Sequence, residues 1–281
     1  MSDAYNISII THNRPVLLEK TIKSVLKAVK NRDVPIYVIW QDPKDYTVEY
    51  TREVLNRYDS GLAKITIQQK ISVSPEENID SARLEALTIA FQDPLVKYAL
   101  VFEDDVCVSS DILSFVDAVI QNESKNRHFR GINFGSKEEN FSVFGYSRIR
   151  YGIHGPASVI SRGTWKNSGL ANSKGKILPR TWDGYIEPYL KTGFMVTPNI
   201  SRYIDFGTHG THSNGNNEDY FLGLRKSFSA LEKNEFIKPI YGHQQIVHMW
   251  RHDSKKYSAI ENPYYALKYY LTRIRDYLES K

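Results

Sequence analysis

The sequence predicts an α/β fold whose sheet is mainly parallel in the N-terminal half. Two observations support this prediction. Short β-rich runs alternate with segments whose apolar residues recur at helical spacing, and polar groups directly follow several of the β-rich runs. Strands that alternate with helices are typical of a parallel sheet with right-handed crossovers. In such sheets ligands bind beyond the carboxyl ends of the strands, so the polar groups at these ends are the candidate site.

The N-terminal part of the chain shows this alternation clearly. In its first expected helix, Leu18, Ile22, Val25 and Val29 recur every three or four residues and therefore share one face. The expected strands are residues 7–10, 34–40, 65–68 and 99–102, and the expected helices are residues 17–29, 50–58 and 78–91.

The second half predicts a mixed or antiparallel extension of the sheet. Its expected strands are residues 131–135, 142–151 and 155–160, and its expected helices are residues 112–120 and 182–190. Pro188 breaks or kinks the second of these helices. Residues 207–217 form a polar, Gly-rich loop, and unstructured loops of this length are often lids or binding loops. No internal repeat or low-complexity linker is visible, so we expect residues 1–281 to form a single domain.

The composition excludes some classes of protein and leaves others open. Cys107 is the only cysteine, which excludes intrachain disulfides and cysteine metal clusters. The net charge of +5 suits an anionic substrate, a membrane surface or nucleic acid. Because no clustered basic stripe or known motif is present, we expect no nucleic-acid partner. No apolar run approaches the roughly 18 residues that span a bilayer, and the N-terminus lacks a signal-peptide pattern, so we expect a soluble, cytoplasmic chain.

The C-terminal segment, residues 262–281, predicts a helix with two alternative roles. Leu267, Leu271, Ile274 and Leu278 form one apolar stripe, with basic residues among the polar positions. One interpretation docks this helix on the core of its own domain. The other is a basic, Tyr-rich helix in peripheral contact with an anionic membrane surface.

Three adjacent carboxylates end the apolar run of residues 99–102. Glu103, Asp104 and Asp105 repel one another and resist burial unless a cation lies among them. Oxygen ligands at the carboxyl end of a strand suit Mg²⁺ or Mn²⁺ shared with substrate phosphates, which predicts a metal–nucleotide site. The alternative is an acidic turn that leads into the helix beginning near Asp111, because acidic residues gather at helix starts.

Polar groups at two other strand ends point to the same place. Asn13 and Arg14 follow the first expected strand, and Asp42 follows the second. Because the carboxyl ends of parallel strands meet at one edge of the sheet, these groups and the acidic stretch are expected to face a common crevice.

The chain resembles family 13 glycosyltransferases, the group of N-acetylglucosaminyltransferase I and protein O-mannose N-acetylglucosaminyltransferase. The resemblance covers roughly residues 7–222. It is carried by Arg14, Gln41, Asp42, the segment 101–115 with its acidic residues, Trp182, Asp183, Pro198, Ser201, Arg202, Phe206, Gly207, Gly210, Asn214, Gly215, Tyr220 and Phe221. The membrane anchor, stem and disulfides of eukaryotic members are not seen in this sequence.

The resemblance implies a GT-A fold with a Rossmann-like mixed sheet flanked by helices, and a donor site at the acidic strand end. Asp105 would be the direct ligand of Mn²⁺ (or Mg²⁺), while Glu103 and Asp104 would contact the ribose or orient the metal's surroundings. Arg14 would lie near the uracil. Residues 1–110 would form the nucleotide-binding half and residues 111–260 the acceptor and catalytic half.

Two further residues belong to the expected donor site. Asp42 matches the family's second-strand Gln-Asp pair. Arg83 has two alternatives, a contact with the donor phosphate or an ion pair with the acidic stretch.

The resemblance also implies a catalytic base. Asp183 matches it by its position after Trp182, and the alternative interpretation is an acid in the first turn of a surface helix. Glu187, one turn later, is the reserve candidate. In the loop, Thr211, Ser213 and Asn214 would donate hydrogen bonds to phosphate.

The resulting hypothesis is a metal-dependent inverting glycosyltransferase that moves a sugar, N-acetylglucosamine by resemblance, from a UDP-sugar to a hydroxyl of a glycan or glycoconjugate. Two alternatives stay open. One is a GT-A transferase with another donor, such as UDP-glucose, UDP-galactose or a GDP-sugar, because residues 9–15 also look like family 2 transferases. The other is a non-catalytic module that binds a carbohydrate or nucleotide.

Overall fold

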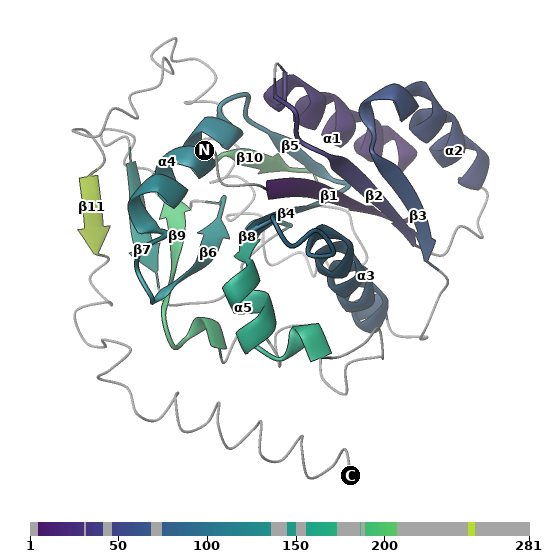
Figure 1. Cartoon of the computed structure of the whole chain (residues 1–281). Helices are drawn as coiled ribbons and strands as arrows, with labels where there is room; N and C mark the ends of the chain where they lie inside the picture. Colours follow the sequence, from purple (N-terminus) through teal and green to yellow (C-terminus); the bar gives the residue numbers. More distant parts are fainter. Residues whose placement is uncertain are drawn as a thin grey trace, which may run out of the picture.

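A large mixed sheet organises the part of the chain that the computed structural model describes (Figure 1). The described residues are 5–30, 32–41, 47–68, 75–135, 145–149, 156–172, 186, 189–206 and 247–250. Within them the main sheet has nine strands in the order β11-β7-β9-β6-β8-β4-β1-β2-β3, and β10 and β5 form a separate two-stranded sheet.

The N-terminal half is a parallel sheet, as the sequence predicted. Its strands are β1 (Tyr5–Thr11), β2 (Ile36–Gln41), β3 (Lys64–Gln68) and β4 (Tyr98–Glu103). Its helices are α1 (Pro15–Ala28), α2 (Val48–Arg57) and α3 (Pro75–Ala90), with a short 3-10 turn η1 (Asp59–Gly61). Strand β1 pairs in parallel with both β2 and β4, and β2 pairs in parallel with β3. The α/β fold class and the parallel N-terminal half are therefore confirmed.

The second half extends the sheet with mixed pairing. Its elements are β5 (Val106–Val108), α4 (Ile112–Glu123), β6 (Phe129–Asn133), β7 (Gly145–Ile149), β8 (Ala157–Ser161), α5 (Arg162–Asn167), η2 (Leu170–Asn172), β9 (Phe194–Pro198), β10 (Tyr203–Asp205) and β11 (Val247–Trp250). Strand β8 runs antiparallel to β4 and β6, whereas β9 is parallel to β6 and antiparallel to β7. The expected mixed extension is confirmed, but β5, β9, β10, β11 and α5 were not predicted.

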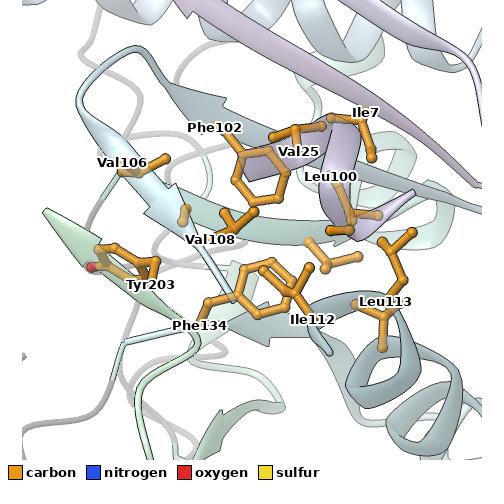
Figure 2. Close-up of a cluster of buried hydrophobic side chains, with 14 of the residues drawn as sticks. Ile7, Val25, Leu100, Phe102, Val106, Val108, Ile112, Leu113, Phe134 and Tyr203 are labelled. Atoms are coloured by element: carbon orange, nitrogen blue, oxygen red, sulfur yellow. The ribbon is translucent and has the colours of Figure 1, made fainter. Parts of the chain in front are cut away.

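Helices cover both faces of the sheet because its buried strands are apolar on both sides. Ile9 and Phe102 belong to the core cluster that also holds residues of α1, α2 and α4, while Ile10 and Val101 belong to the cluster of α3. Figure 1 shows α1 and α2 on one side of β1–β3 and α3 on the other. Figure 2 shows part of the first cluster, which holds Phe102 together with Val25 of α1, Val108 of β5 and Ile112 of α4.

The turn from β1 into α1 positions Arg14. Pro15 is the first residue of α1, where its missing N–H costs no hydrogen bond and its fixed φ favours the helix. Arg14 occupies the N-cap position without capping through its side chain, and its carbonyl accepts a hydrogen bond from Leu18 N at 2.9 Å. The guanidinium is therefore available to reach the end of β4.

Part of the expected architecture lies outside the described residues. This applies to most of the expected helix 182–190, to the loop 207–217 and to the C-terminal helix 262–281. The described part contains no helix that is both long and apolar enough to cross a membrane.

Candidate functional site

The carboxyl ends of β1, β2 and β4 lie side by side, as the sequence predicted. The register pairs Ile10 with Glu103 and Thr11 with Trp40, so the residues that follow these strands leave the sheet at one edge. The indole N–H of Trp40 donates to the carbonyl of His12 at 3.0 Å, which joins the end of β2 to the turn after β1. The polar turns after β1 and β4 are thus neighbours at one site.

The acidic residues do not begin a helix. Strand β5 follows Asp105 directly, and α4 begins only at Ile112. Asp111, next to that helix, accepts a hydrogen bond from the Ser109 hydroxyl at 2.6 Å and pairs with Arg202 at 3.2 Å. Residues 104–105 thus form a turn between β4 and β5, and the short strand β5 separates this turn from the helix that follows.

Asp104 anchors the turn from within the protein. Its side chain is fully buried, and its Oδ2 accepts hydrogen bonds from the Thr11 hydroxyl at 2.8 Å and from the backbone N–H of His12 at 3.2 Å. Its Oδ1 forms an ion pair with Arg14. Burial raises the pKa of Asp104, against the opposing effect of Arg14 and the two hydrogen bonds. This geometry suits a residue that orients its neighbours.

Asp105 combines burial with an unsatisfied oxygen. Asp105 is 5% exposed, and its Oδ2 lies 2.5 Å from Arg14 Nη1. Its Oδ1 is buried and has no hydrogen-bond partner among the described residues. Burial raises the pKa of Asp105 to about 7, with the charges of Asp205, Glu103 and Asp104 adding to it and that of Arg14 opposing it. A buried carboxylate oxygen without a donor is suited to a cation.

Helix α1 holds the acidic turn in place from the other side. The Thr21 hydroxyl lies 2.9 Å from the carbonyl oxygen of Asp104 and 2.6 Å from that of Val106. The Ser24 hydroxyl accepts a hydrogen bond from the backbone N–H of Val108 at 3.1 Å. The backbone of residues 104–108 is therefore fixed to the same helix that begins after Arg14.

Arg14 bridges the two aspartates. Its Nη2 contacts Asp104 and its Nη1 contacts Asp105, while its own side chain remains 31% exposed. Burial lowers the pKa of Arg14, but the two carboxylates outweigh burial and raise it above its ordinary value. The structure thus places the guanidinium of Arg14 against the two aspartates of the acidic turn. Its expected position near a uracil remains a prediction.

Glu103 has a cation of its own. Its carboxylate lies 2.6 Å from Arg83 Nη2, and Arg83 Nη1 lies 3.4 Å from Asp80 on the same helix, α3. The structure therefore shows the second of the two alternatives for Arg83, an ion pair with the acidic stretch. Its role toward a donor phosphate is untested by the structure.

Asp205 is a member of the site that the sequence analysis missed. Strand β10 pairs antiparallel with β5 so that Asp205 lies opposite Val106, and the backbone N–H of Phe206 donates to the carbonyl of Asp105 at 2.7 Å. The Asp205 carboxylate is buried and raises the pKa of Asp105. The signal for it was its place between Arg202 and Phe206, two residues already singled out by the resemblance.

Several predicted site residues lie outside the described residues. They are Asp42, Asp183, Glu187, Thr211, Ser213 and Asn214, and their roles remain predictions. Among the described residues, no group of three or more His, Cys, Asp or Glu side chains forms a metal centre. The orphaned Oδ1 of Asp105 nevertheless fits a hard cation that takes a single protein carboxylate and its other ligands from phosphate and water.

Comparison with known proteins gives distant structural likenesses. No protein-family model and no curated protein matches the chain. Among solved structures, residues 1–349 of TarS from S. aureus match with a TM-score of 0.46 and 14% identity over 82% of this chain. The mannosyltransferase PcManGT from Pyrobaculum calidifontis, in complex with GDP-Man and Mn²⁺, matches with a TM-score of 0.44 and 12% identity over 82% of this chain.

A third structure is the galactosyltransferase LgtC in complex with donor and acceptor sugar analogues, with a TM-score of 0.37 and 13% identity; the match covers 65% of this chain and 70% of LgtC. This chain spans less than two thirds of the first matched chains, namely 66% of TarS 1–349, 40% of a longer TarS chain and 65% of PcManGT. Since these TM-scores are below 0.5, the function must be argued from the site itself.

Proposed function

We propose that the chain is a metal-dependent inverting glycosyltransferase with a GT-A fold that transfers N-acetylglucosamine from its UDP-sugar to a hydroxyl of a glycan or glycoconjugate. One observation supports this most directly: Asp105, which follows strand β4, keeps a buried oxygen that has no hydrogen-bond partner in the described part of the chain. The resemblance to family 13 transferases covers the same acidic stretch. Residues 1–110 would bind the nucleotide, and residues 111–260 would bind the acceptor.

The donor half would hold the leaving group. Asp105 would bind Mn²⁺ or Mg²⁺, which supplies charge neutralisation on the diphosphate as the glycosidic bond breaks. Asp104 would keep Asp105 oriented through its bonds to Thr11 and the backbone of His12. Glu103, held by Arg83, would contact the ribose.

The remaining donor contacts would come from the strand-end turns and the Gly-rich loop. Arg14 and Asp42 would lie near the nucleotide, with Arg14 beside the uracil. Thr211, Ser213 and Asn214 would donate hydrogen bonds to the diphosphate, because hydroxyl and amide groups in a Gly-rich loop suit an anion.

The acceptor half would activate the attacking hydroxyl. Asp183 would take its proton as the general base, on the face of the sugar opposite the leaving nucleotide. A single base in that position implies single displacement and therefore inversion at the anomeric carbon. A positioned base of this kind contributes roughly 10²–10⁴-fold in rate.

Two measurements on purified protein test this proposal. In titration calorimetry, UDP should bind in the presence of Mn²⁺ and markedly more weakly in EDTA, because the diphosphate needs the cation. Equal affinity in the two buffers would remove the metal site from the proposal. Asp183→Asn should then keep UDP binding and lose roughly 10²–10⁴-fold in transfer, whereas full turnover would reassign the base.

The donor is identified by a screen of UDP- and GDP-sugars for hydrolysis in the presence of Mn²⁺. UDP-N-acetylglucosamine should be hydrolysed fastest. Preference for UDP-glucose, UDP-galactose or a GDP-sugar would keep the transferase but change its donor, and the absence of hydrolysis with every donor, together with metal-dependent UDP binding, would favour a binding module.

A further inference from the structure

We propose that Arg14 is a built-in counter-cation of Asp105, which competes with a divalent cation for this carboxylate in the free protein and gives it up when the cation arrives together with a nucleotide diphosphate. The inference rests on the proposed function and goes beyond it. It assigns Arg14 a role in setting the order of binding, in addition to any contact with the base.

The cations of the site are distributed unequally among its carboxylates. Glu103 has Arg83 at 2.6 Å, so its charge is compensated without Arg14. Asp104 and Asp105 share the single guanidinium of Arg14, whose two terminal nitrogens each contact one of them. Among the described residues, Arg14 is thus the cation that compensates the charge of the carboxylates proposed to bind the metal ion.

The two aspartates depend on Arg14 unequally. Asp104 has the Thr11 hydroxyl and the His12 N–H besides Arg14. Asp105 has Arg14 on Oδ2, and its Oδ1 is buried without a hydrogen-bond partner among the described residues. Withdrawal of Arg14 therefore changes Asp105 most, and Asp105 is the carboxylate that keeps an oxygen for another cation.

A metal ion on Asp105 would change the charge balance of the site. A divalent cation on Oδ1 would lie on the same carboxylate as the guanidinium, and two cations that close together repel each other strongly in a buried site. A diphosphate brings negative charge for both of them. Binding of the cation and of the nucleotide must then be coupled, and by thermodynamic linkage each strengthens the other by the same factor.

The exposure of Arg14 makes such an exchange feasible. Its side chain is 31% exposed, unlike the carboxylates it bridges, and its backbone is fixed at the start of α1. The guanidinium can therefore leave Asp105 by side-chain rotation toward solvent or toward an incoming phosphate, without rearrangement of the turn.

The experiment is a titration of the nucleotide-free protein with Mn²⁺ at pH 8.0, in which electron paramagnetic resonance measures the free ion. The variants are Arg14→Gln and Arg14→Lys. Arg57→Gln is the control, because Arg57 forms an ion pair with Glu19 at 2.8 Å on the surface, away from the acidic turn. We expect Arg14→Gln to bind Mn²⁺ at least tenfold more tightly than the wild type. Arg14→Lys should fall between them, because one ammonium cannot bridge both carboxylates, and the control should equal the wild type.

The same titration with saturating UDP measures the coupling. UDP should strengthen Mn²⁺ binding more in the wild type than in the Arg14 variants. An Arg14→Gln protein that folds, by circular dichroism, but binds Mn²⁺ no more tightly than the wild type would overturn the inference; if this variant fails to fold, Arg14→Lys decides on the same criterion. A wild type that binds no UDP with Mn²⁺ would instead refute the proposed function, so the two failures are distinguishable.

Discussion

Two buried clusters of arginine and carboxylate groups lie in different parts of this sheet, and they are built differently. On α4, Glu123 is fully buried; its Oε1 accepts from the Tyr146 hydroxyl at 2.8 Å and from Arg148 Nε at 3.0 Å, and its Oε2 accepts from Arg148 Nη2 at 2.8 Å. Both oxygens are therefore satisfied. At the end of β4, Asp105 has a partner for one oxygen and none among the described residues for the other.

This difference in hydrogen bonding distinguishes a buried carboxylate that stabilises the fold from one that is suited to bind a ligand. A buried ion pair whose lone pairs are all used holds elements together and is costly to break. Here it joins α4 to β7, and burial together with Glu123 raises the pKa of Tyr146 above its ordinary value. A buried carboxylate with a free oxygen is instead suited to a ligand that the protein itself does not supply.

The largest expected effect falls on the satisfied cluster. Glu123→Gln removes the carboxylate charge that lies 2.8 Å from Arg148 Nη2, and we expect the free energy of unfolding to fall by about 3 kcal/mol, the lower end for a broken buried pair because Arg148 is 20% exposed. Urea unfolding followed by circular dichroism measures it. An unchanged unfolding midpoint would mean that this cluster does not stabilise the fold.

Asp105→Asn should weaken ligand binding without lowering stability, in contrast to Glu123→Gln. We expect the affinity for Mn²⁺ in the presence of UDP to fall at least tenfold, about 1.4 kcal/mol, because an amide is a weaker ligand than a carboxylate. The free energy of unfolding at pH 8 should not fall, since the substitution removes a charge that burial disfavours. Loss of stability with intact Mn²⁺ binding would place Asp105 among the structural groups.

Over a single pH unit, the pKa of Asp105 predicts a smaller effect on stability. Its folded-state pKa of about 7 lies above the ordinary value of 3.8, so the folded protein binds more protons than the unfolded chain between these values. This contribution to stability is fully present below pH 3.8 and is lost as the pH rises toward 7, at about 1 kcal/mol per pH unit. Urea unfolding of the wild type and Asp105→Asn at pH 5 and pH 6 isolates it, and identical slopes would contradict it.

The smallest effect is expected at an exposed pair. Arg57 Nη1 lies 2.8 Å from Glu19 Oε1, with 55% of the Arg57 side chain exposed. Because solvent screens such pairs, Arg57→Gln should leave the unfolding midpoint unchanged within error. A shift as large as that of Glu123→Gln would show that the distinction between exposed and buried clusters fails in this molecule.

Periodicity and strand-end chemistry predicted the N-terminal half of the fold, because its strands and helices alternate and each has its own apolar pattern. Short elements such as β5 and β10 escaped prediction, since their apolar signal spans only a few residues and their pairing is set by tertiary contact. Strand β9 was missed although Phe194, Met195 and Val196 form an apolar run, because a run this short does not distinguish strand from helix.

The same reasoning found much of the candidate site but not its connections. Arg14, Glu103, Asp104 and Asp105 were selected from strand ends, which parallel topology brings together. The sharing of one guanidinium by two aspartates depends on side-chain geometry that spacing along the chain does not encode. Asp205 enters the site through the long-range pairing of β10 with β5, which its place between Arg202 and Phe206 in the sequence does not by itself reveal.

The hydrogen bonds from α1 to the acidic turn have a consequence for timing. Because Thr21 and Ser24 tie residues 104–108 to the helix that begins just after Arg14, the arginine and the aspartates share one rigid backbone frame. Release of Asp105 by Arg14 then requires rotation of the Arg14 side chain and no movement of the backbone. The exchange of counter-ions would not have to wait for a main-chain rearrangement, and any step that needs one would have to arise elsewhere in the molecule.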